Sequence, residues 1–161
     1  MSARYGQRLR LIHWVTAVLV AVQVSLALLN IALYEPRPIL AETLVQSHIS
    51  VGAVLFLLTV ARVVLRSFTN VPPRSDVAAL RYAATINHCL LYVCLLVLPI
   101  TGYLKLAALG FTVTPFGLLP LPALSLNVPF ARMADLAHDG TAILLVLLLS
   151  LHIAAAILHH R

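Results

Sequence analysis

The sequence predicts an all-α membrane protein, folded as an up-down bundle of four transmembrane helices in one domain over residues 1–161. Of the 161 residues, 61% are hydrophobic and only 10% are charged, a composition that excludes an ordinary soluble domain. Four apolar stretches are each long enough to cross a hydrocarbon core, which takes about 20 helical residues. Helices are expected because a helix satisfies its own backbone hydrogen bonds in lipid. The stretches are Leu11–Leu33, Leu44–Leu65, Ile86–Leu106 and Met133–Leu158.

The connections between these stretches predict how the helices are arranged. The links at Tyr34–Thr43 and Ser67–Arg81 are short, and short links favour antiparallel neighbours. The third link, Ala107–Arg132, is longer and contains four prolines, yet it stays apolar. We expect it either to cover the outer end of the bundle as a lid or simply to rest in the lipid interface.

Charge placement predicts that both termini are cytoplasmic. Arginines gather before the first stretch and around the second link, whereas four of the five acidic residues lie on the opposite side. The sequence has no basic stripe interleaved with aromatic residues, so nucleic acid is not an expected partner. Cys89 and Cys94 lie inside the third stretch in no haem-attachment motif, and we expect them to pack.

Four histidines recur at two depths of the predicted bundle. His138 and His152 lie 14 residues apart, so they point to nearly the same side of one helix, about 21 Å apart along its axis. His13, near the cytoplasmic end of the first stretch, matches the depth of His152, and His48, near the outer end of the second, matches that of His138. We predict that each pair ligates a haem iron, which takes two opposed axial nitrogens. The alternative is a set of hydrogen-bonded interhelical histidines, whereas one tetrahedral zinc site is excluded by the distance between the pairs.

A small residue follows each of these histidines by one helical turn, on the same helix face. A flat porphyrin needs small neighbours beside its ligand, which makes Gly52, after His48, a candidate cofactor contact. Small residues are also common at ordinary membrane helix interfaces, so both interpretations stay open. The other three residues are Ala17, Ala142 and Ala156.

Two arginines are candidate partners for the propionates of a haem. Arg62 follows His48 by 14 residues and therefore lies on the same side of the second stretch, at the depth of the inner pair. Arg10 lies three residues before His13. Arginine pairs well with carboxylates, and the alternative is a cation that snorkels to the headgroups.

Two further histidines have weaker assignments. His88 lies near the cytoplasmic start of the third stretch, where we expect no histidine partner at its depth and a packing or hydrogen-bonding role. His159 follows His152 by seven residues. It either contacts a propionate or a quinone headgroup, or it is solvated at the membrane interface.

Several short motifs, in order along the chain, resemble one protein family. They are Arg4-Tyr5-Gly6 with Leu11-Ile12-His13-Trp14, His48-x-x-x-Gly52 with Ala61-Arg62, Leu98-Pro99-Ile100-Thr101-Gly102-Tyr103, Pro115-Phe116-Gly117-Leu118, and Leu151-His152 through His159-His160. Together they resemble the bacterial cytochrome b561 family, which is related to the cytochrome b subunits of formate dehydrogenase and nickel-iron hydrogenase.

The resemblance implies two b-type haems, with His13 and His152 on the inner iron and His48 and His138 on the outer iron. It also implies electron exchange with the quinone pool of the bacterial inner membrane. Some members of the family are superoxide oxidases, which take an electron from superoxide and pass it to ubiquinone.

We therefore expect a dihaem b-type cytochrome, embedded in lipid, that carries electrons between an outer-side donor and ubiquinone. Superoxide is one candidate donor, which would make the chain a superoxide:ubiquinone oxidoreductase, and Lys105, Arg132 or Arg37 would then attract the anion. One alternative is a cytochrome subunit that serves a partner dehydrogenase or hydrogenase. Another is a haem-free transporter or assembly protein, although the sequence has no inverted repeat.

Overall fold

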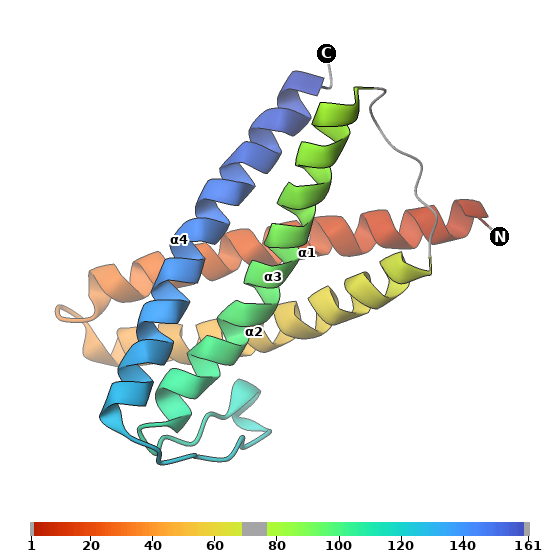
Figure 1. Ribbon diagram of the computed structural model, residues 1–161. Coiled ribbons are helices and arrows are strands. Elements are labelled where there is room, and N and C mark those ends of the chain that lie inside the picture. The colour runs from red at the N-terminus through yellow and green to blue at the C-terminus, as the bar shows by residue number, and fades with distance from the viewer. Residues whose placement is uncertain (1, 69–76, 160–161) are drawn as a thin grey trace.

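Four long helices make up most of the computed structural model, which describes residues 2–68 and 77–159. Each is long and apolar enough to cross a membrane. A short 3₁₀ helix, η1, lies in the connection before the last of them (Figure 1). The predicted all-α four-helix transmembrane fold is therefore confirmed. The elements are α1 (Ser2–Leu33), α2 (Pro38–Ser67), α3 (Ala78–Ala107), η1 (Pro115–Gly117) and α4 (Val128–His159).

The helices begin earlier than the apolar stretches predicted. Helix α1 begins at Ser2 rather than Leu11, and α3 begins at Ala78 rather than Ile86. Hydropathy marks only the part of a helix that fits the hydrocarbon core, whereas the backbone hydrogen bonds continue into the polar headgroup region. Helix α2 begins with Pro38, a residue favoured in the first helical turn because no backbone donor is needed there.

The helices form two antiparallel hairpins, α1–α2 and α3–α4, which cross one another (Figure 1). Within each hairpin the backbones pack closely, and the hairpins meet through α2 and α3. In the described part of the chain, α4 keeps its Cα atoms more than 8 Å from those of α1 and α2. Any contact between α4 and the first hairpin is therefore made by side chains.

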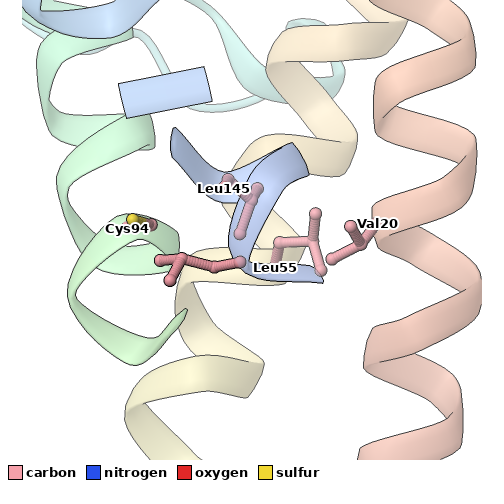
Figure 2. Close-up of a cluster of buried hydrophobic side chains, with 5 residues drawn as sticks. Val20, Leu55, Cys94 and Leu145 are labelled. Carbon is pink, nitrogen blue, oxygen red and sulfur yellow. The ribbon is translucent and has the colours of Figure 1, made fainter. Parts of the chain in front are cut away.

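An apolar cluster fills the middle of the bundle and draws on all four helices (Figure 2). Val20, Leu55 and Leu145 each follow a predicted histidine ligand of their own helix by about two helical turns, which is about 10 Å along a helix axis. Cys94 packs in this cluster, as expected for a buried thiol. The cluster therefore separates the two histidine levels by a layer of hydrocarbon. It consists of Val20, Leu55, Cys94, Leu145 and Leu148.

The connection between α3 and α4 folds against the end of the bundle opposite the chain termini (Figure 1). The backbone N–H of Phe116 donates a 2.9 Å hydrogen bond to Ser50 Oγ on α2. The hydroxyl of Tyr103 donates a 2.7 Å bond to the carbonyl of Pro122. Phe116 has a φ of 56°, a left-handed conformation that is uncommon outside glycine. The segment is therefore attached to α2 and α3 at this end of the bundle.

Replacing Leu55 with alanine should destabilise the bundle, because Leu55 is 5% exposed in the central cluster. Loss of a buried leucine typically lowers the free energy of unfolding by about 2–5 kcal/mol. Leu57→Ala is the matched control, since Leu57 lies on the same helix but is 67% exposed. Unfolding by SDS titration should separate the two variants, and equal losses would contradict the packing described.

Candidate functional site

The structure brings the predicted histidines together in the predicted pairs. The ring centroids of His13 and His152 lie 6.1 Å apart, with an interplanar angle of 70°. Those of His48 and His138 lie 6.3 Å apart, at 68°. All four side chains are half-buried. The imidazoles thus bridge α4 to α1 at one level and α4 to α2 at the other, between helices whose backbones stay apart.

We keep the predicted orientation as labels only, calling the level of His48 and His138 outer and that of His13 and His152 inner. At the outer level, α3 fixes the orientation of the His138 ring. A carbonyl accepts but cannot donate, so the 2.9 Å contact between His138 Nδ1 and the carbonyl of Leu98 places a proton on Nδ1. The hydroxyl of Thr101 lies 3.3 Å from the same nitrogen. The lone pair of Nε2 is thereby left for another partner, the arrangement usual for a metal-ligating histidine.

Gly102 allows the His138 ring to approach α3 this closely. A Cβ atom at Gly102 would lie 3.1 Å from Cε1 and 3.3 Å from Nδ1 of His138. This contact was not predicted from the sequence, although a signal was present. Pro99 and Gly102 lie inside the last third of a long apolar helix, where proline removes a backbone donor and glycine lowers helix propensity.

On α2, the backbone around His48 is held by α1. Gln23 Nε2 donates a 3.0 Å hydrogen bond to the carbonyl of His48. A Cβ at Gly52 would lie 3.2 Å from that Nε2, so Gly52 gives Gln23 room to approach. The ring nitrogen His48 Nδ1 is buried and has no hydrogen-bond partner in the described part of the chain. An unsatisfied buried nitrogen is unusual and points to a functional site.

At the inner level, Arg62 contacts the His13 ring. Its Nη1 lies 2.8 Å from His13 Nδ1, and its Nε donates a 3.0 Å hydrogen bond to the hydroxyl of Tyr92. The guanidinium carbon lies 5.9 Å from the centroid of the Tyr92 ring. Arg62 therefore lies at the depth of the inner pair, as its spacing from His48 predicted.

The prediction that His88 has no histidine at its depth is wrong. Its ring centroid lies 5.1 Å from that of His152, at an interplanar angle of 75°. The reason is the rotation of α3 about its own axis, which turns His88 towards α4. Helix packing sets that rotation, and the spacing of residues along the sequence does not encode it.

Three further residues named from the sequence are Arg10, His159 and Lys105. The side chain of Arg10 is exposed. The side chain of His159 lies outside the described residues, although its backbone ends α4. Lys105 Nζ forms a 2.8 Å ion pair with Asp135 Oδ1, which offsets the positive charge of this lysine.

Residues 4–161 match the family model described as prokaryotic cytochrome b561. The chain belongs to this family. It is 30% identical to cytochrome b561 homolog 2 of Escherichia coli K12, over 98% of this chain and 85% of that protein. It is 23% identical to cytochrome b561 homolog 1 of the same organism, over 98% of this chain and 90% of that protein.

Family membership makes the chain a haem-b electron-transfer cytochrome and a multi-pass protein of the bacterial inner membrane. It sets aside the alternative of a haem-free transporter or assembly protein. The family resemblance seen in the sequence motifs is thereby confirmed.

The paired histidines fit the coordination that a haem requires. An imidazole nitrogen lies about 2 Å from a bound metal ion and roughly 1 Å from its ring centre, so two opposed ligands have centroids about 6 Å apart. The observed 6.1 and 6.3 Å agree with this value. Among the described residues no three histidine, cysteine or acidic side chains could hold a metal ion by themselves, whereas a haem needs only two protein ligands.

Gly102→Ala should displace the His138 ring, because the new methyl group would lie 3.1 Å from it. We expect an altered reduced-minus-oxidised b-type spectrum and a loss of about 1–3 kcal/mol in the free energy of unfolding, typical of overpacking. Gly140→Ala is the control, since its Cβ would meet nothing within 4 Å. A normal spectrum and stability for Gly102→Ala would show that the close approach is unimportant.

Proposed function

We propose that this cytochrome holds two b-type haems, the inner one through His13 and His152 and the outer one through His48 and His138. The observation that supports this most directly is the pair of ring separations, 6.1 and 6.3 Å, between helices whose backbones stay more than 8 Å apart. His88 and His152 are a poorer pair, because their centroids are 5.1 Å apart and α3 packs closely against α4. A bound haem supplies a one-electron iron couple at each level.

The residues of the chain hold and insulate the two sites. The carbonyl of Leu98 keeps the proton of His138 on Nδ1 and so presents Nε2 towards the space between α2 and α4. The apolar cluster around Leu55 and Leu145 excludes water between the two levels. Arg62 and Arg10 would pair with haem carboxylates at the inner level. Gly52 and His159 remain proposed cofactor contacts.

We place the electron donor on the side of His48 and His138, and ubiquinone as the acceptor. Superoxide is the candidate donor, because the outer end of the bundle carries exposed cations. Arg37 and Arg132 are exposed at this end. Lys105 contributes less than the sequence suggested, since Asp135 lies 2.8 Å from its ammonium group. The second candidate role is that of a cytochrome subunit for a partner redox enzyme. The activity of the purified chain distinguishes the two roles.

Replacing each proposed ligand with alanine should lower the haem content from two per chain to about one, because loss of one axial imidazole leaves the iron weakly held. The pyridine haemochrome assay measures this for His13→Ala, His48→Ala, His138→Ala and His152→Ala. His88→Ala is the control and should retain both haems. Unchanged haem content in the first four variants, or a loss caused by His88→Ala, would refute the proposed ligation.

The purified cytochrome should reduce ubiquinone when superoxide is supplied, and neutralising Arg37 and Arg132 should slow this reaction. At low ionic strength we expect a fall of about threefold in the Arg37→Gln/Arg132→Gln double variant, and a smaller one in high salt, because steering charges are screened. The Arg66→Gln/Arg81→Gln double variant is the charge-matched control, since both arginines are exposed, at the end of α2 and the start of α3. A purified chain with no such activity would favour the partner-subunit role.

A further inference from the structure

Arg62 fixes the protonation of the His13 ring. A guanidinium has only donors, so His13 Nδ1 must accept the 2.8 Å hydrogen bond from Nη1. A neutral imidazole whose Nδ1 accepts a bond carries its proton on Nε2. Tyr92 holds the guanidinium in this place, because its hydroxyl accepts a 3.0 Å bond from Nε.

This arrangement is opposite to the one at the outer level. His138 donates from Nδ1 to the carbonyl of Leu98 and therefore presents an unprotonated Nε2. An axial ligand that binds iron through Nε2 needs that lone pair and must carry its proton on Nδ1. The hydrogen bond from Arg62 and ligation of iron by His13 Nε2 thus exclude one another.

We propose that Arg62 and the inner haem compete for His13, so that Arg62 must release the ring before the iron can bind. This rests on the proposed assignment of His13 as an inner ligand. For Nε2 to hold the iron, the hydrogen bond to Nδ1 would break and the ring proton would pass from Nε2 to Nδ1, which would leave the Nε2 lone pair for the metal. The ring stays neutral, with no proton gained or lost and no electron transferred.

The order of haem loading follows from this difference between the levels. The outer site presents His138 with an unprotonated Nε2, the form that binds a metal. At the inner site, the hydrogen bond from Arg62 to His13 must break first. The outer haem therefore binds first and the inner haem more slowly. Arg62 acts here as a positioning residue that delays the filling of one site, and Tyr92 acts by keeping it in place.

The test is stopped-flow binding of haemin to the chain of residues 1–161, produced in haem-depleted cells and reconstituted in nanodiscs. The slow phase is assigned to the inner site by its persistence in a His138→Ala background. Tyr92→Phe, which frees the guanidinium but keeps its charge, and Arg62→Met, which removes the donor, should each accelerate the slow phase about tenfold, the fold-change expected for a charged hydrogen bond. Arg66→Gln is the control and should leave the phase unchanged.

Equal slow-phase rates in all variants, or a slower phase in Tyr92→Phe, would overturn the exchange. A structure of the haem-loaded chain gives a second readout that does not depend on rates. Arg62 should then lie beyond hydrogen-bonding distance of His13 Nδ1, and a retained 2.8 Å contact would refute the proposal. A wild-type chain that never binds an inner haem would refute the ligand assignment itself, whereas normal haem content with unchanged rates would refute only the exchange.

Discussion

The bundle depends on imidazole rings that connect α4 with α1 and α2. Over the described residues, the backbones of α1 and α2 do not themselves pack against that of α4. His152 reaches His13 on α1, and His138 reaches His48 on α2, while among the described helices the backbone of α4 packs against that of α3 alone. Lipid provides no hydrophobic force that would press these helices together. The connection between the first hairpin and α4 is therefore made by side chains, namely the two histidine pairs and the apolar cluster that lies between them.

The two histidine levels are built differently although their ring separations are nearly equal. The outer ring of His138 is a hydrogen-bond donor to the Leu98 carbonyl, and the inner ring of His13 is an acceptor from Arg62. A carbonyl partner makes an imidazole a stronger electron donor to a metal, and a nearby cation opposes positive charge on that metal. The chain thereby distinguishes two sites that a comparison of histidine spacing alone would treat as equivalent.

The sequence was sufficient for the features that follow from length and helical spacing. The interval of 14 residues between His138 and His152 predicted the two levels and the pairing, because helix geometry converts spacing into depth and direction. The contact of His88 with His152 was missed because it depends on how α3 is rotated. The support of His138 by Gly102 was missed as well, since a glycine inside a helix does not reveal which neighbour approaches it. The helices begin before the apolar stretches because hydropathy marks only the residues that fit the hydrocarbon core. It does not mark where the helical backbone hydrogen bonds begin.

The hydrocarbon layer formed by Val20, Leu55, Cys94, Leu145 and Leu148 has an electrical consequence. Most of a membrane voltage falls across the part of a bilayer that ions and water do not enter. Under the two-haem arrangement, an electron that moves from one level to the other crosses this layer and does work with or against the voltage. A full crossing corresponds to about 2.3 kcal/mol for each 100 mV. The energised state of the membrane would therefore bias the direction of electron flow through the protein.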